Sequence, residues 1–239
     1  MRAKLAEMKI FREMKFSQNK KLSPLTAALI DFLSDVIVIF VIVLLIIKPF
    51  FFAPFRVQQQ SMMPNVLDGE FIIVWKTPYL LGTEYQRNDI VVFRPPNSEN
   101  FLIKRVVGLP GETIRFAEGF VWIEDANGDF TKLDERFLAP SNLGSTCISS
   151  SFCSDAEKST IVDFDIPDGE YFVLGDNRLA SRDSRTCFQM KCAEDTSNFL
   201  TQDEIEGRAI LTFARIWQEG NKKHFSVTNT RILSDPLDQ

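Results

Sequence analysis

An apolar run near the N-terminus restricts the architecture of this chain more than any other feature. Residues 36–47 read VIVIFVIVLLII without one polar side chain. Extended to about Phe32–Phe52, the stretch reaches the roughly 20 residues that an α-helix needs to cross a ~30 Å hydrocarbon core. Asp31 and Asp35 lie near one interface, and Lys48 can reach the other. We therefore predict a transmembrane anchor over residues 27–52.

Two other interpretations of this run fit the sequence less well. A helix packed on a soluble domain of this size would be shorter and would carry a polar face, whereas this run is apolar on every side. A cleaved signal peptide would have a shorter apolar stretch and a small-x-small exit, whereas this run ends in Lys-Pro-Phe-Phe-Phe. Residues 1–25 hold seven basic and two acidic residues, which predicts a cytoplasmic N-terminus. The expected organisation is a cytoplasmic tail (1–26), the anchor (27–52) and an extracytoplasmic domain (53–239).

The charge balance of the outer part excludes one class of function. The whole chain carries a net charge of −5 although its first 25 residues are basic, so the remainder is strongly acidic. Nucleic-acid binding needs clustered Lys and Arg on the folded domain. We therefore expect no nucleic-acid partner, and the length of the outer part suits a single domain with one continuous core.

The four cysteines form two close pairs in the sequence. Cys147 and Cys153 are six residues apart, and Cys187 and Cys192 are five apart, in segments rich in polar residues. Such cysteines usually pair in an oxidising compartment, and of the three connectivities open to them we favour the two local bridges. A four-cysteine zinc site is the alternative, but the spacings fit the usual ligand pattern poorly.

The outer part is rich in short segments of β-branched and aromatic residues, separated by turn residues such as Leu109-Pro110-Gly111 and Asn127-Gly128. No amphipathic helix of three turns is predicted after Phe55, and the Ser-rich residues 140–160 are expected to form a surface excursion. We predict a mainly antiparallel β domain. Its expected strands are Glu70–Lys76, Asp89–Phe93, Phe101–Val107, Thr113–Phe116, Val121–Glu124, Tyr171–Leu174 and Ala209–Trp217.

A lone serine follows the anchor in the stretch QQQSMMP. Ser61 can act as a nucleophile only if another group removes its proton. The chain has a single histidine, His224, and its charged surroundings (GNKKHFS) favour a solvated surface residue over a member of a Ser/His/Asp triad. The sequence also lacks the HExxH and the paired His/carboxylate patterns of metal hydrolysis, so we expect no cofactor.

A lysine is the other candidate base. Lys104 lies in FLIKRVVGLPGE, where alternation places it on the same face of a strand as Leu102 and Val106, with Arg105 on the opposite face toward solvent. If Lys104 points inward, desolvation lowers its pKa, and the neutral amine can accept the Ser61 proton. The alternative is an edge lysine that faces solvent.

Four segments in order resemble the characteristic boxes of the type I signal peptidases, or leader peptidases, which are membrane-bound Ser/Lys endopeptidases. They read QSMMPNVLDGEFIIVWK, RNDIVVFRPPN, FLIKRVVGLPGE and GDNRLASRDSR and span Ser61 to Arg185. The resemblance implies a mainly β catalytic domain of the signal-peptidase type behind one transmembrane helix. It also implies cleavage of signal peptides from exported preproteins after small residues (Ala-x-Ala type sites), through an acyl-enzyme and without a cofactor.

The resemblance also assigns roles to individual residues. Ser61 would be the nucleophile, Lys104 the general base, and Ser181 a hydrogen-bond partner that orients the lysine amine. Asp183 and Arg185 would form a supporting ion pair, and Asp176 and Arg178 would be structural; without the resemblance, all four would be interpreted as solvated loop charges. Shallow apolar pockets for the substrate side chains would be lined by Phe55, Val57, Met62, Val66 and Ile103.

The sequence departs from the family pattern at several positions. Gln59 stands where a Ser or Thr often helps to hold the oxyanion, and we retain its amide as a candidate donor. Asn65 replaces the usual Thr, and Leu179-Ala180 replaces a more polar pair. These changes leave two alternatives open: a specialised relative that matures a narrow substrate set, or a membrane-tethered β domain that binds without catalysis.

The resemblance further implies partners and a location. The partners would be signal peptides and the lipid bilayer, beside the protein-export machinery. The location would be the inner (cytoplasmic) membrane, with the catalytic domain on the periplasmic side.

Overall fold

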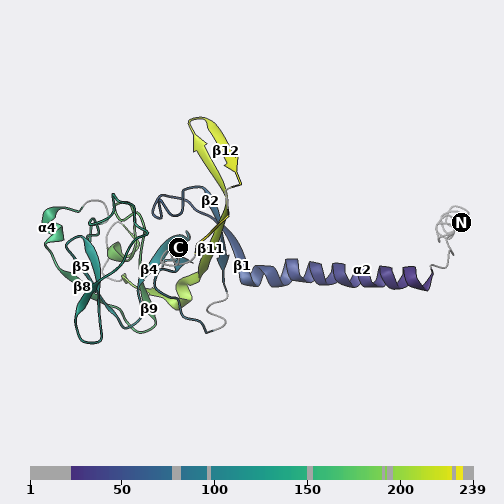
Figure 1. Cartoon of the computed structure of the whole chain (residues 1–239), viewed down its shortest axis with the longest axis horizontal. Coiled ribbons are helices and arrows are strands. Elements are labelled where there is room, and N and C mark those ends of the chain that lie inside the picture. The colour runs from purple at the N-terminus through teal and green to yellow at the C-terminus, as the bar shows by residue number, and fades with distance from the viewer. Residues whose placement is uncertain are drawn as a thin grey trace, which may run out of the picture. The chain divides into compact units, whose positions relative to one another are not determined.

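The computed structural model describes residues 23–76, 82–95, 98–149, 153–189, 192, 196–227 and 230–233. The chain divides into two compact units, Met1–Lys48 and Pro49–Gln239, and each is described by itself. The N-terminal unit is helical where it is described, and the C-terminal unit is mainly β (Figure 1).

The helix of the N-terminal unit has the composition of a membrane span. Helix α2 (Pro24–Ile42) begins behind Ser23, whose Oγ accepts a hydrogen bond from Thr26 N, and has proline at its first position. The stretch Pro24–Leu45 is long and apolar enough to cross a membrane, with a mean hydropathy of 2.8 and no burial against the rest of the chain. A π-helical turn (Val43–Ile47) and α3 (Lys48–Phe51) follow it. Helical structure therefore covers most of the predicted anchor and ends at Phe51.

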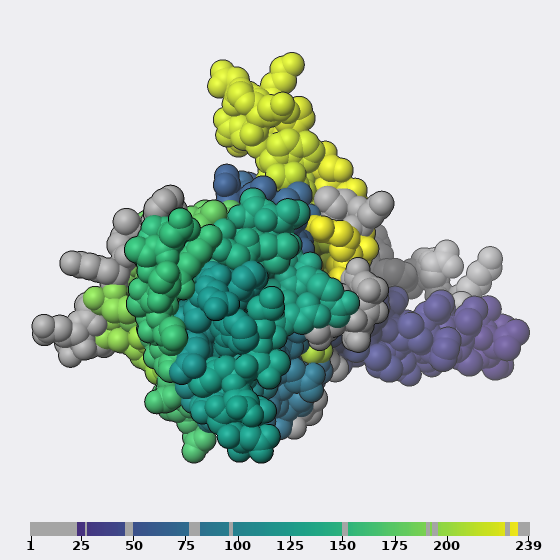
Figure 2. Space-filling view, turned by 60° about the vertical axis from the view of Figure 1, so that its left-hand side comes forward, coloured from purple at the N-terminus to yellow at the C-terminus, as the bar shows by residue number. Residues whose placement is uncertain are grey.

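The larger of two sheets in the C-terminal unit is antiparallel throughout. Its strands run in the order β1-β2-β11-β3-β4-β9-β10, and β12 and β13 pair with the long strand β11. Because β11 continues beyond its partners in the sheet, the β11–β12 hairpin projects from the body of the unit (Figures 1 and 2). The strands are β1 (Phe52–Arg56), β2 (Glu70–Trp75), β3 (Ile90–Phe93), β4 (Leu102–Gly108), β9 (Glu170–Leu174), β10 (Leu200–Thr201), β11 (Ile205–Glu219), β12 (Lys222–Ser226) and β13 (Arg231–Ile232).

A second antiparallel sheet has the order β7-β6-β5-β8. Its strands are β5 (Thr113–Ala117), β6 (Phe120–Glu124), β7 (Phe130–Lys132) and β8 (Val162–Asp165). The short helix α4 (Asp155–Lys158) precedes β8 and starts with a capping box, in which Ser154 and Glu157 bond to each other's backbone N–H groups. Short 3₁₀ turns lie at Ser184–Thr186 and Gln202–Glu204.

The middle of the larger sheet is buried on both faces. Along β3, Ile90 and Val92 pack into one apolar cluster, while Val91 and Phe93 pack into another. Successive side chains of a strand point to opposite faces, so both faces of the sheet are covered here. The same environment surrounds the neighbouring strand β4, whose residues are buried from Ile103 to Gly108.

The prediction of a mainly β, antiparallel domain behind one apolar helix is confirmed, and every predicted strand is present to within a few residues. Strands β1, β7, β8, β10, β12 and β13 were not predicted. Strand β1 was missed because it starts inside the apolar stretch assigned to the anchor. It is held by pairing along its whole length with β2, from Phe52 opposite Trp75 to Arg56 opposite Phe71.

The described residues of 140–160 lie mostly at the surface, as predicted, but three of them do not. Asn142, Thr146 and Cys147 are buried in this segment. Buried arginines bind there: Arg178 donates to Thr146 Oγ1 at 2.9 Å, and Arg185 donates to the carbonyl oxygen of Cys147 at 2.8 Å. The excursion is therefore anchored at three buried residues, which supply acceptors for arginines that the local sequence pattern does not reveal.

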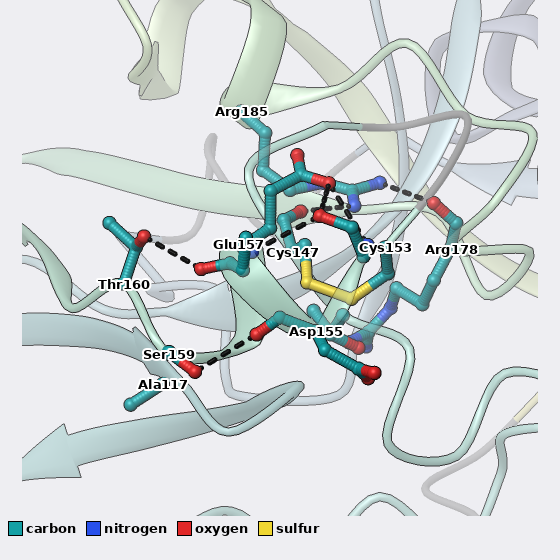
Figure 3. Close-up of a disulfide and its surroundings, with 12 residues drawn as sticks. Ala117, Cys147, Cys153, Asp155, Glu157, Ser159, Thr160, Arg178 and Arg185 are labelled. Atoms are coloured by element: carbon teal, nitrogen blue, oxygen red, sulfur yellow. Dashed lines mark hydrogen bonds between the residues drawn. A yellow bond between two sulfur atoms is a disulfide. The ribbon is translucent and has the colours of Figure 1, made fainter.

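The four cysteines form two local disulfides, Cys147–Cys153 and Cys187–Cys192. Figure 3 shows the first bridge beside Glu157 and the two buried arginines. The alternative of a four-cysteine zinc site is excluded, because every thiol is paired.

Candidate active site

Ser61 lies at the start of a turn that follows β1. The turn covers residues 61–65 and is closed by a hydrogen bond from Val66 N to Met62 O at 2.9 Å. Asn177, from the loop after β9, binds the backbone at the start of this turn. Its backbone N–H donates to Ser61 O at 2.9 Å, and its side chain donates to Gln60 O at 3.2 Å. Ser61 is only 6% exposed, so little of the residue is accessible to solvent.

Lys104 extends from β4 to meet this serine. Its Nζ lies 2.9 Å from Ser61 Oγ and 2.8 Å from the carbonyl oxygen of Ile103, and the residue is 2% exposed. Desolvation lowers the pKa of Lys104 from 10.5 to about 8; the carboxylates of Asp183 and Asp176 oppose this change, and Arg185 adds to it. An amine with this pKa is partly neutral near pH 7 and can accept a proton from the hydroxyl that it contacts.

The prediction that Arg105 faces solvent is wrong. Arg105 is 2% exposed, and its guanidinium binds both carboxylate oxygens of Asp176, at 2.8 and 2.7 Å. The ring of Phe137 covers the guanidinium, with its centroid 4.1 Å from Cζ. Alternation along β4 was a correct guide to side-chain direction, but both faces of this central strand are covered, so neither direction leads to water.

The structure does not form the expected hydrogen bond between Ser181 and Lys104. Ser181 Oγ is buried and makes no hydrogen bond of ordinary geometry, although it lies close enough to Asp183 to help lower the pKa of that carboxyl group. The second acceptor for Lys104 is instead the carbonyl oxygen of Ile103. Ser181 still lies beside the site, since a Cβ built on Gly175 would meet both Ser181 Oγ, at 2.2 Å, and Ser61 O, at 2.5 Å.

The ion pair between Asp183 and Arg185 is present and fully buried. Arg185 Nε and Nη2 bind the two carboxylate oxygens, both at 2.9 Å, and Gly175 N donates to Asp183 Oδ2 at 3.1 Å. Burial would raise the pKa of Asp183, but its bonds to Arg185 and to Gly175 hold that pKa below the ordinary value. The carboxylate therefore stays charged, and its charge raises the pKa of Lys104.

The interpretation of Asp176 and Arg178 as solvated loop charges does not hold either. Both residues are completely buried. Arg178 binds Glu135 at 2.5 Å and donates to the carbonyl oxygen of Gly175 at 3.0 Å. These arginines and carboxylates satisfy one another and fix the loop that carries Ser181 and Asp183.

A cleft of about 330 Å³ opens beside Ser61 and Lys104. Of the predicted pocket residues, Phe55, Val57 and Ile103 line it. Met62 and Val66 are fully buried in the apolar cluster that Val57 and Ile103 share.

The cleft also has walls that were not predicted: Ile72, Val92 and Phe101. Phe101 packs edge-on against Phe55, with the ring centroids 5.0 Å apart. The alternation of Phe101 with Ile103 was a usable signal for this aromatic wall. Asn177 was also missed, and its role depends on a contact across more than 100 residues of sequence that no local pattern reveals.

Gln59 lines the cleft and is exposed. Its backbone has a left-handed conformation, with φ of 82°, and its N–H donates to Asp68 Oδ1 at 2.9 Å. These features hold the residue at the rim of the cleft, two positions before the serine.

His224 is not the partner of Ser61. It lies in β12 and stacks on Trp217, the residue opposite it in β11, with the ring centroids 5.2 Å apart. Within the described part of the chain, no group of three or more His, Cys, Asp or Glu side chains is placed to hold a metal ion.

A serine hydroxyl in contact with a buried lysine of lowered pKa, at the side of an open cleft, is an arrangement that could support nucleophilic hydrolysis. Comparison with known proteins identifies the family. Residues 29–214 match the family described as "Signal peptidase, peptidase S26". The chain belongs to this family, whose members are serine peptidases.

Similar proteins include several bacterial signal peptidases. Signal peptidase I T of Bacillus subtilis (strain 168) is 37% identical over 149 residues, which cover 62% of this chain and 72% of the relative. Signal peptidase I of Pseudomonas aeruginosa is 32% identical over 195 residues, covering 72% of this chain and 68% of the relative. A solved signal peptidase I from Enterococcus faecalis V583 is 32% identical, covers 53% of this chain and 97% of its own, and has a TM-score of 0.36.

Proposed function

We propose that this protein is a membrane-anchored endopeptidase that cleaves the signal peptides of exported preproteins after small residues, at sites of the Ala-x-Ala type. The observation that carries the proposal is the 2.9 Å contact between Lys104 Nζ and Ser61 Oγ in buried surroundings. A binding domain would gain nothing from burying a lysine whose desolvation is costly. A nucleophilic serine does gain from it, because the desolvated amine becomes a base near neutral pH.

The reaction would proceed through an acyl-enzyme. Ser61 Oγ attacks the carbonyl carbon that precedes the scissile bond, and Lys104 Nζ takes the hydroxyl proton. The tetrahedral intermediate then collapses as Lys104 returns that proton to the leaving amine, which releases the mature chain and leaves an ester on Ser61. Water, deprotonated by the same amine, hydrolyses the ester and frees the signal peptide. The backbone N–H of Ser61 and the amide of Gln59 are the candidate donors to the oxyanion.

The position of the serine in the chain supports a substrate that lies in a bilayer. Ser61 follows the end of α3 at Phe51 by ten residues, and β1, which contributes Phe55 to the cleft, occupies most of that interval. This short spacing along the chain fits a substrate whose hydrophobic part lies in the bilayer that the helix would cross. The basic tail before the helix supports a cytoplasmic N-terminus, and the two disulfides fit an oxidising compartment on the other side.

The test is cleavage of a preprotein with an Ala-x-Ala site by the full-length protein in detergent, with the product N-terminus read by mass spectrometry. Ser61→Ala and Lys104→Ala are assayed beside it, and Ser226→Ala, a serine in the exposed hairpin strand β12, serves as the matched control. Cleavage after the motif that both site variants abolish and the control retains is the expected result. Undiminished cleavage by Lys104→Ala would refute the mechanism. Failure of the folded wild type to cut would favour a narrow substrate set or a binding role.

A further inference from the structure

Asn65 ends the turn that Ser61 begins, and its side chain makes two contacts outside that turn. Its Nδ2 donates to Asp176 Oδ2 at 2.8 Å and to the carbonyl oxygen of Phe137 at 2.8 Å. Both partners are acceptors only, so the amide nitrogen must face them, and both of its hydrogens are used. A hydroxyl at this position would have a single hydrogen to offer.

The two acceptors of Asn65 belong to a group that surrounds Arg105. Asp176 binds the Arg105 guanidinium through both carboxylate oxygens, and the ring of Phe137 lies over the same guanidinium. Arg105 directly follows Lys104 on β4. Asn65, Asp176, Arg105 and Phe137 thus form a closed ring of contacts, which joins the turn of the nucleophile to the strand of the base.

The loop that carries Asp176 also holds the other end of the turn. The next residue, Asn177, donates from its backbone to Ser61 O, and Asp176 accepts from Asn65 at the far end. Both ends of the five-residue turn are therefore fixed to one loop, and that loop is fixed to β4 by the ion pair with Arg105.

We infer that Asn65 is a positioning residue, which sets the separation of Ser61 Oγ and Lys104 Nζ by linking the nucleophile turn to the Asp176–Arg105 ion pair. The inference rests on the proposed function, because it assigns Asn65 to the reaction of that dyad. Asn65 itself touches neither the cleft nor the reacting atoms.

The same contact has an electrostatic consequence that distinguishes positioning from simple structural support. The Asp176 carboxylate raises the pKa of Lys104, in opposition to burial. Each hydrogen bond donated to a carboxylate offsets part of its charge. Removal of the Asn65 donor should therefore strengthen the field of Asp176 at the lysine and move the pKa of Lys104 upward.

The test uses Asn65→Leu, which keeps a similar size and removes both donors without adding a charge, and the milder Asn65→Ser. In the full-length protein we expect kcat to fall by about 10- to 100-fold with a much smaller change in KM, because the reacting groups are displaced while the cleft is intact. The acid limb of the kcat/KM profile should move up by about 0.5 pH units in Asn65→Ser and about 1 unit in Asn65→Leu. Asn142→Ala is the matched control, a buried asparagine whose backbone N–H donates to the carbonyl oxygen of Ala139.

A purely structural Asn65 would behave like the control, with lower stability in denaturant and an unmoved acid limb, and that result would overturn the inference. Wild-type values of kcat and of the acid limb in both variants would do the same. The titration of Lys104 is also followed without turnover, from the ¹³Cε chemical shift of labelled lysine. If the wild type does not cleave preproteins, the proposed function fails, and the difference in this titration between wild type and Asn65→Ser still decides whether the link exists.

Discussion

Replacement of Lys104 by methionine should abolish cleavage and, near neutral pH, stabilise the fold. Methionine has a similar length and fills the same buried space without a charge. Burial lowers the pKa of Lys104 from 10.5 to about 8, so the folded protein at pH 7 must hold a proton that its surroundings disfavour. A change of this size corresponds to about 3 kcal/mol. The substitution also removes two hydrogen bonds, to Ser61 Oγ and to Ile103 O, of about 1 kcal/mol each.

The balance favours the variant by about 1 to 2 kcal/mol at pH 7, a rise in Tm of a few degrees for a domain of this size. The sign follows from proton binding. Between pH 8 and 10.5 the unfolded wild type binds more protons than the folded protein, so wild-type stability rises with pH across this window. Above pH 10.5 Lys104 is neutral in both the folded and the unfolded wild type, so the cost of burying its charge is gone. Only the two hydrogen bonds of Lys104 then separate the stability of wild type from that of the variant. Wild type should then be the more stable protein.

The assay is denaturant unfolding of the full-length protein in detergent at pH 7 and pH 10, with Lys104→Met beside wild type. Lys132→Met is the matched control, because Lys132 is an exposed strand residue that rests on the ring of Phe120. The Lys132→Met control should show no gain in stability at pH 7 that is lost at pH 10. A Lys104→Met protein that is less stable than wild type at pH 7, or a gain that persists unchanged at pH 10, would refute the argument that desolvation of this amine creates the base.

Three further substitutions test other parts of the site. Gly175→Ala should lower kcat by about 100-fold in a folded protein, because the new Cβ would lie 2.5 Å from Ser61 O and displace it; unchanged kcat would show that the serine does not depend on this contact. Gln59→Ala should lower kcat by up to about 100-fold without raising KM if its amide holds the oxyanion, and unchanged kinetics in a preprotein assay would assign that role to the backbone alone. Asp183→Asn should destabilise the domain by about 3 to 5 kcal/mol in urea unfolding, because Arg185 would stay buried without its carboxylate; stability equal to that of wild type would contradict this.

Local sequence patterns correctly predicted the elements whose structure is determined by residues close together in the sequence. Short segments rich in β-branched and aromatic residues located β2, β3 and β4, and the uninterrupted apolar run located α2. Cysteine spacing indicated the two bridges. Strand β1 was missed because apolarity cannot distinguish the last residues of a membrane helix from a strand that pairs with β2. The helix–strand boundary at Phe51 depends on that pairing partner.

The environment of the site depended on contacts that are distant in the sequence. Arg105 was expected in solvent because its partner Asp176 is 71 residues away and its cover Phe137 is 32 residues away. The resemblance to signal peptidases named Ser61, Lys104 and the Asp183–Arg185 pair, and these residues lie together in the structure. It also named Ser181 as the partner of the lysine amine, whereas the structure gives that place to a backbone carbonyl group of β4 itself.

The buried charges around the site explain how the pKa of a lysine can be lowered among so many ionised groups. Asp176 is paired with Arg105, and Asp183 with Arg185, so each carboxylate near Lys104 has an arginine bound to both of its oxygens. The effects of Asp183 and Arg185 on the pKa of the lysine have opposite signs and partly cancel. Desolvation is therefore the largest influence that remains, and it favours the uncharged amine. Loss of Asp183 or Asp176 should lower the pKa of Lys104 further, whereas loss of Arg185 should return it toward the value of an ordinary lysine and remove the neutral amine that the proposed mechanism needs.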